Sequence, residues 1–207
     1  MSAHIITISA TFGAGGSVVG PLVAERLGLP FVDRAIPVAV AEEIGCSLEE
    51  ALVHDDRAES GIGRILAGAA RLPNVTFGGM DIYLPDNSYV PEEEFVGRTE
   101  KVLEKVTEGV ILGRAGALVL ATKPYTLHVR LDGPRARRLT RVSESFGLGA
   151  REAERMLDDN DRARAAYVKH FYRVDPADPE LYHLVLDGTR LPELVCADLI
   201  VSAATQV

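Results

Sequence analysis

The fold is decided close to the N-terminus by residues 5–17, which read IITISATFGAGGS. The first residues of this stretch form a short apolar, β-branched run that predicts a buried strand. A glycine-rich turn ends the run, and the helical pattern of residues 18–27 follows and closes at Gly28. Because Pro21 removes an intrahelical hydrogen bond, we expect this helix to start late or to be distorted near its beginning. A strand, a glycine turn and a helix in this order predict the start of a β-loop-α-β unit.

Short apolar strands alternate with helices along the rest of the chain. Strands are predicted at residues 31–33, 110–112, 126–131 and 183–186, and helices at 35–44, from 47, over 91–108, 135–146, 150–171 and 192–204. This alternation predicts an α/β fold, in which a parallel sheet is covered by helices on both faces and ligands bind at the carboxyl ends of its strands. Residues 61–91 are the least regular and are the best candidate for an insertion. With no internal repeat, residues 1–207 are expected to form a single domain.

Composition limits the class of protein. The chain of 207 residues is 47% hydrophobic and 25% charged, which are ordinary globular values, and its formal net charge of −8 argues against a protein that coats nucleic acid or an anionic membrane. Its two cysteines, Cys46 and Cys196, lack metal-ligand spacing, so we expect no disulfide framework and a reducing, cytoplasmic setting. We expect no secretion signal, and no apolar run approaches the roughly 18 residues of a membrane span.

The glycine turn lies where a phosphate-binding loop belongs, between the first strand and the first helix. Glycines allow backbone N–H groups to converge on one anion, and the helix dipole adds positive potential. The strict pattern G-x-x-x-x-G-K-[ST] is not met, because Ala10 replaces the first glycine and Gly16 replaces the lysine. The alternative is a tight turn in which glycine only permits a positive φ. The expected phosphate contacts are Gly13, Ala14, Gly15, Gly16 and Ser17.

Arginines suited to phosphate binding occur in three places. Arg114 directly follows the third strand, and a charge at the end of a buried strand needs a partner or an anion. The other two groups lie on the two helices after the fourth strand, and either could equally be a solvated surface. These groups are Arg135, Arg137, Arg138 and Arg141 on the first helix, and Asp161 with Arg164 on one face of the second.

Other polar residues have alternative interpretations. Asp33 and Asp132 follow strands and could be helix caps as readily as site residues. The histidines are scattered without paired spacing for a metal, and His128, within a predicted strand, is expected to be structural. Ser17 has no evident His/Asp relay, so nucleophilic catalysis by its hydroxyl is not expected.

Taken together, these pieces resemble the cytidylate-kinase-like family of P-loop nucleoside monophosphate kinases. The resemblance covers nearly the whole chain outside residues 61–91. Its motifs are Ile6-Thr7-Ile8-Ser9, Phe12-Gly13-Ala14-Gly15-Gly16, Gly20, Leu29-Pro30-Phe31-Val32-Asp33, Leu112-Gly113-Arg114, Pro134 with Arg138 and Arg141, Asp161 with Arg164 and Tyr167, Tyr182-His183-Leu184-Val185, and Thr189-Arg190-Leu191. It implies a P-loop NTPase-type three-layer fold, with a five-stranded parallel sheet and a helical lid at about 133–172. It also implies transfer of the γ-phosphoryl group of ATP to CMP or dCMP with Mg²⁺.

The resemblance further implies roles for individual residues. The loop over 13–17 would wrap the donor's phosphates, with Ser17 as a ligand of Mg²⁺. Arg138 and Arg141 would be catalytic lid arginines that contact the transferring group. The acceptor monophosphate and its sugar would be held by Asp33, Arg114, Asp161 and Arg164.

The chain departs from the family mainly on the donor side. Cytidylate kinases carry a lysine where this chain has Gly16, and an aspartate where it has Ala115. The divergent branch that the chain resembles commonly has charged residues at the positions of Ala10, Thr11 and Ser17. Three functions therefore stay open: a kinase for a pyrimidine monophosphate, a nucleotide sensor without turnover, and a kinase for another small phosphorylated acceptor. The acceptor base and the oligomeric state are also left open.

Overall fold

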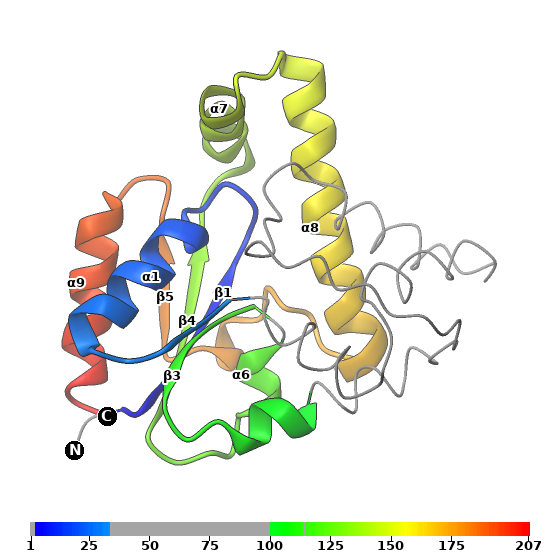
Figure 1. Cartoon of the computed structure of the whole chain (residues 1–207). Coiled ribbons are helices and arrows are strands. Elements are labelled where there is room, and N and C mark those ends of the chain that lie inside the picture. Colours follow the sequence, from blue (N-terminus) through cyan, green and yellow to red (C-terminus); the bar gives the residue numbers. More distant parts are fainter. Residues whose placement is uncertain (1–2, 34–99, 114) are drawn as a thin grey trace, which may run out of the picture.

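The computed structural model of the protein describes residues 3–33, 100–113 and 115–207 (Figure 1). Its strands form a five-stranded sheet in the order β2-β3-β1-β4-β5, and every neighbouring pair is parallel. The sheet confirms the fold class expected from the sequence. The strands are β1 (Ile5–Ala10), β2 (Phe31–Asp33), β3 (Gly109–Leu112), β4 (Thr126–Asp132) and β5 (Leu184–Asp187).

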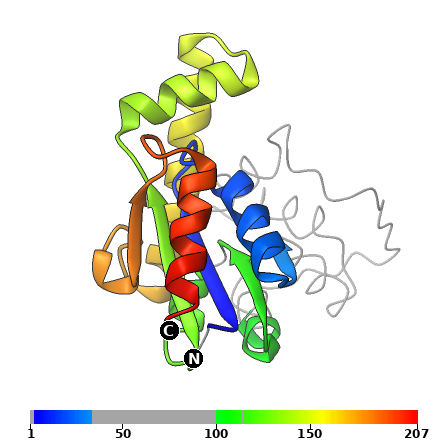
Figure 2. The same ribbon diagram turned by 90° about the vertical axis from the view of Figure 1, so that its left-hand side faces the viewer.

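Helices cover both faces of the sheet, because side chains of each buried strand alternate between the two faces. On one face, α1 and α9 lie side by side and pack on Ile6 and Ile8 of β1 (Figure 2). On the other face, Leu103 and Leu120 pack on Ile5 and Ile111. The described helices are α1 (Gly16–Leu27), α6 (Gly116–Val119), α7 (Arg135–Phe146), α8 (Ala150–Tyr172) and α9 (Glu193–Ala204), with a 3-10 turn η2 (Pro179–Leu181) and a helical segment at 100–105.

Helices α7 and α8 form a pair that rises beyond the carboxyl end of β4 (Figure 1). The two helices share a small apolar core around Val142, Ala153 and Leu157. Phe12 of the glycine turn packs into the same core. The expected lid is therefore docked on the turn that follows β1.

Several local expectations differ from the structure. Helix α1 starts at Gly16, so the late start expected from Pro21 is wrong. Pro21 lies on the exposed side of the helix. Water can therefore hydrate the backbone carbonyl that receives no hydrogen bond because proline lacks an N–H. Helix α6 and η2 were not expected, since each is too short to show a periodic pattern. The helices expected at 35–44 and from 47, the first part of the helix expected over 91–108, and the irregular segment 61–91 lie outside the described residues.

The described helices also bear on membrane association. Within the described ranges, none is both long enough and apolar enough to span a bilayer.

Candidate phosphate-binding site

The sheet order sets where a ligand can bind. Strands β1 and β3 are neighbours, but α1 follows β1 on one face of the sheet and α6 follows β3 on the other. Connections that leave toward opposite faces open a crevice at the carboxyl ends of the two strands, and open α/β sheets bind ligands there. The glycine turn after β1 lies at this switch point.

The glycine turn ends in a helix N-terminus that can accept an anion. Gly13 and Gly15 have φ of 80° and 88°, and Gly15 is the N-cap of α1. The first turn of α1 holds no acidic residue and its N-cap makes no side-chain hydrogen bond. Within the described residues, no backbone acceptor is found for the N–H groups of Gly13, Gly15, Gly16 and Ser17. Such N–H groups at a helix start are ready donors to phosphate.

The packing around Gly16 leaves no room for a lysine side chain at this position of the turn. A Cβ at Gly16 would lie 2.6 Å from Ala10 Cβ and 3.2 Å from Leu112 Cδ1. Carbon atoms in contact normally stay about 3.5 Å or more apart. The two departures from the strict pattern are therefore linked in space, because the methyl group of Ala10 fills the room that a side chain at position 16 would need.

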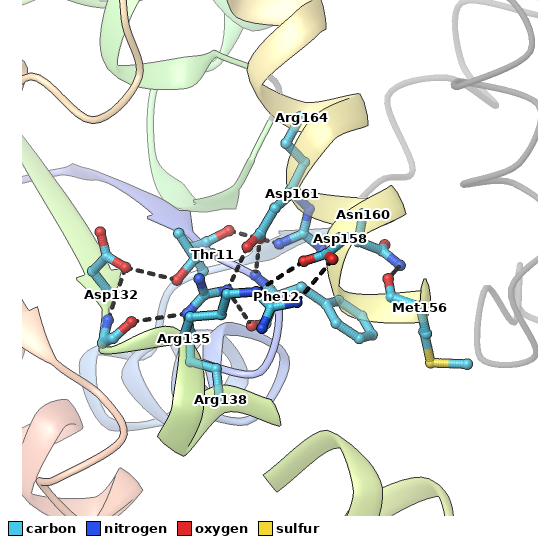
Figure 3. Close-up of polar contacts among 12 residues, drawn as sticks. Thr11, Phe12, Asp132, Arg135, Arg138, Met156, Asp158, Asn160, Asp161 and Arg164 are labelled. Carbon is cyan, nitrogen blue, oxygen red and sulfur yellow. Dashed lines mark hydrogen bonds and ion pairs between the residues drawn. The ribbon is translucent and has the colours of Figure 1, made fainter. Parts of the chain in front are cut away.

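Phe12 joins the turn to both lid helices (Figure 3). Its N–H donates to Asp161 Oδ1 at 2.9 Å, and its carbonyl accepts from Arg138 Nη1 at 3.0 Å. Arg138 also forms an ion pair with Asp161 at 2.5 Å and donates from Nε to the Gly133 carbonyl at 2.8 Å. Arg138 is only 7% exposed, so this buried guanidinium, with its three partners, fixes α7 and α8 to the turn.

Arg164 reaches the turn from α8. Its Nη1 donates to the carbonyl of Ala10 at 2.6 Å, and its guanidinium lies 5.6 Å from the centre of the Phe12 ring (Figure 3). The structure thus brings three of the expected site residues, Arg138, Asp161 and Arg164, together around residues 10–12.

Asp132, at the end of β4, supports the start of the turn. Its Oδ1 accepts from Thr11 Oγ1 at 3.0 Å and from the Gly133 N–H at 2.8 Å, while Arg130 donates to Oδ2 from Nε and Nη2 at 3.0 and 2.8 Å. Burial alone would raise the pKa of this carboxyl group, but the Gly133 N–H and the Arg130 guanidinium outweigh it and lower the pKa. The carboxylate therefore stays ionised beside the turn.

Arg141 and Glu193 lie at the N-terminal end of α1. Arg141 donates to the carbonyl of Gly188 and forms an ion pair with Glu193, the first residue of α9. A Cβ at Gly15 would lie 3.6 Å from Glu193 Cγ and 3.9 Å from Arg141 Nη2. A carboxylate held by an arginine thus borders the N-terminus of α1, where a phosphate would bring further negative charge.

For the remaining expected residues, the structure gives no contact with the glycine turn. Arg114 lies outside the described residues. Asp33 ends β2 in register with Leu112 of β3, so it lies at the carboxyl ends of the strands, as the turn does. Arg135 forms ion pairs with Asp158 and Glu154 at 2.8 Å on the exposed side of the lid.

Sequence reasoning missed some residues of this site. Arg130 could have been found, because it lies two positions before Asp132 on a strand and so shares its face. Glu193 had no signal, since a glutamate at the start of a helix has an ordinary role there. Phe12 was noted only as a motif residue, and its two backbone contacts depend on the docking of the lid.

The described side chains of the site offer few ligands to a metal ion. Among the described residues, no group of three or more His, Cys, Asp or Glu side chains could hold a metal ion. Ser17 has an exposed side chain in the first turn of α1. A single hydroxyl beside a phosphate site suits Mg²⁺, which usually keeps several waters and takes its other ligands from substrate phosphates.

Similarity to known proteins identifies the family. The profile of the cytidylate kinase-like family matches residues 5–190. The chain belongs to the cytidylate kinase-like family. A cytidylate kinase of Methanopyrus kandleri is 27% identical over 198 residues, which cover 91% of this chain and 86% of that protein. A uronate isomerase of Corynebacterium glutamicum is 34% identical over 104 residues, or 50% of this chain, but this chain spans only 20% of that protein.

Solved structures agree with the fold of this cytidylate kinase-like chain. An uncharacterised protein from Eubacterium ventriosum superposes with a TM-score of 0.66 at 17% identity and covers 97% of both chains. A gluconokinase from Sinorhizobium meliloti gives a TM-score of 0.50 at 16% identity, covering 98% of this chain and 91% of its own. The fold is that of P-loop kinases, as the sequence resemblance implied.

Proposed function

We propose that this protein is a kinase that transfers the γ-phosphoryl group of ATP to a nucleoside monophosphate, with CMP or dCMP as the expected acceptor. The observation that carries the proposal is the convergence of the glycine turn with Arg138, Asp161 and Arg164 at the switch point of the sheet. Membership of the cytidylate kinase-like family and the similarity to a cytidylate kinase support the nucleotide acceptor.

The reaction itself asks little covalent chemistry of the protein. The bond between the γ-phosphorus and the β–γ bridging oxygen breaks, and that oxygen leaves on ADP with the electron pair. A phosphate oxygen of the acceptor forms the new bond to phosphorus, and a fully ionised acceptor phosphate needs no general base. Positioning and charge neutralisation therefore provide most of the rate enhancement.

The residues of the turn and lid take complementary roles in this proposal. The N–H groups of residues 13–17 hold the donor's phosphates, and Ser17 is the residue that would hold Mg²⁺, which neutralises phosphate charge when bound. Arg141, at the N-terminus of α1, is the lid arginine next to the expected donor phosphates. Arg138 keeps the lid docked on Phe12 through its contacts with the Phe12 carbonyl and with Asp161.

The acceptor is proposed to bind at the carboxyl ends of β2 and β3. Asp33 and Leu112 are aligned there, and Arg114 follows this strand end in sequence. Asp161 of α8 contacts the turn that follows the neighbouring strand β1. At these strand ends, arginine suits the phosphate and aspartate suits the sugar hydroxyl groups of a nucleoside monophosphate.

A coupled assay tests this proposal directly. ATP and Mg²⁺ are supplied with each nucleoside monophosphate in turn, and formation of ADP is followed. We expect turnover that is fastest with CMP or dCMP. Folded protein that forms no ADP with any monophosphate would overturn the proposal.

A second function is favoured by one specific observation. The methyl group of Ala10 closes position 16 to a lysine, which removes a usual source of transition-state stabilisation from the turn. A nucleotide-binding protein without turnover on the same scaffold would explain this. Calorimetry that detects binding of ATP or CMP, together with no product in the coupled assay, would support this second function.

A further inference from the structure

A carboxylate beside the N-terminus of α1 holds the lid arginine that lies next to the expected donor phosphates. Resting on the proposed function, we infer that Glu193 of α9 is a positioning residue, which the donor phosphates displace from Arg141. Binding of the donor then moves the guanidinium from a partner on α9 to the nucleotide, and the charge of Glu193 sets part of the donor affinity. The family resemblance assigns no role to Glu193.

Glu193 and Arg141 meet at the N-cap of α1. A Cβ at Gly15 would lie 3.6 Å from Glu193 Cγ, 3.8 Å from Glu193 Oε1 and 3.9 Å from Arg141 Nη2. This Nη2 is also the nitrogen that pairs with Oε1. A phosphate on the N–H groups of residues 13–17 would therefore lie close to both members of the ion pair, attracted by the guanidinium and repelled by the carboxylate.

The ion pair is accessible enough to water to open. The side chains of Arg141 and Glu193 are 30% and 33% exposed. Ion pairs with this access to solvent contribute about fivefold or less to an equilibrium constant. A triphosphate carries more negative charge than one carboxylate, and it offers two oxygens to the fork of the guanidinium. The phosphates therefore compete successfully with Glu193 for Arg141.

The exchange leaves the lid in place, because other contacts hold the same stretch of α7. Arg137, one helical turn before Arg141, forms an ion pair with Asp187 at 3.3 Å. The carbonyl of Gly188 accepts from Arg141 Nη1, whereas Glu193 is bound by Nη2. Neither of these contacts involves Glu193, so Nη2 changes partner by a side-chain movement alone.

The test measures affinities by calorimetry with two probes, a non-hydrolysable ATP analogue with Mg²⁺ and inorganic tripolyphosphate. Glu193→Gln keeps the size of the side chain and removes its charge, so it should bind both probes about threefold more tightly than the wild type. Asp198→Asn is the matched control, because Asp198 is on the same helix, is 69% exposed and pairs with Arg26 instead. The control should bind both probes like the wild type.

A double-mutant cycle separates release of Arg141 from simple repulsion of the phosphates. Arg141→Gln should weaken binding of the ATP analogue about tenfold. Adding Glu193→Gln to it should improve binding by less than the gain in the wild-type background, because no guanidinium is left to release. If Glu193 only repelled the phosphates, its neutralisation would help at least as much without the arginine that screens it. An equal or larger gain in the Arg141→Gln background, or no gain in the wild-type background, would overturn the inference.

The coupled assay decides the proposed function separately. If the wild type binds tripolyphosphate but forms no ADP with any acceptor, the proposed function fails while the cycle still decides the role of Glu193. If the wild type forms ADP but Glu193→Gln brings no gain in affinity, the inference alone fails. If the wild type binds neither probe, both fail.

Discussion

The packing at Gly16 gives a quantitative prediction about the stability of the turn. In Gly16→Ala, the new Cβ would start 2.6 Å from Ala10 Cβ, about 1 Å closer than two carbons normally approach. Relieving this overlap requires a shift of β1 or α1 in a well-packed region, and overpacking of this kind costs about 1–3 kcal/mol. We therefore expect Gly16→Ala to be destabilised, although alanine is normally the better residue in a helix.

A double-mutant cycle isolates this contact. In Ala10→Gly with Gly16→Ala, the overlapping methyl group is gone, so the pair should be more stable than the sum of the single changes by about 1–2 kcal/mol. The free energies of unfolding of the four proteins are measured in denaturant. Gly16→Ala as stable as the wild type, or a coupling energy below about 0.5 kcal/mol, would refute the reasoning. The same logic predicts that Gly16→Lys is tolerated better when it is combined with Ala10→Gly than when Ala10 is kept.

Three other predictions follow from the site and the core. Arg138→Ala should lower the free energy of unfolding by about 3–5 kcal/mol, because it leaves Asp161 without its buried partner. Adding Asp161→Asn should recover part of this loss. Thermal unfolding that shows no recovery in the double variant would contradict the coupling between the two residues. Glu193→Gln should tighten binding of an ATP analogue about threefold by removing a carboxylate beside the N-terminus of α1, and unchanged or weaker affinity in calorimetry would count against this. Burial and the nearby His183 lower the pKa of His128 from 6.5 to about 4, so the unfolded chain takes up a proton first as the pH falls. Stability should then decrease between about pH 6.5 and 4, by up to about 3 kcal/mol, and His128→Asn should flatten this part of a urea-unfolding profile; an equally steep profile in the variant would contradict the assignment.

Local patterns were enough to predict the sheet. The β-branched run of β1 and the glycine turn after it are determined by neighbouring residues, and so are the Pro-Arg start of α7 and the Gly147 at its end. His128 was expected to be structural, and it is buried with its Nδ1 2.8 Å from Thr7 Oγ1. Elements with many consecutive residues of one pattern were therefore predictable.

The contacts that build the site were not predictable in the same way. Phe12 and Asp161 are separated by 149 positions, and Ala10 and Arg164 by 154. No local pattern specifies that α8 docks on the turn, because that depends on how the sheet aligns both elements. The overlap that explains Gly16 likewise exists only once α1 has packed against β1 and β3.

The central claim is that backbone N–H groups of the turn, together with a guanidinium group of the lid, bind a polyphosphate without a lysine in the turn. A crystal structure of the chain with Mg²⁺, a non-hydrolysable ATP analogue and CMP tests this claim most directly. We expect a phosphate within about 3 Å of the N–H groups of Gly15 and Gly16, with the guanidinium of Arg141 next to it. Triphosphate density elsewhere on the protein would contradict the account.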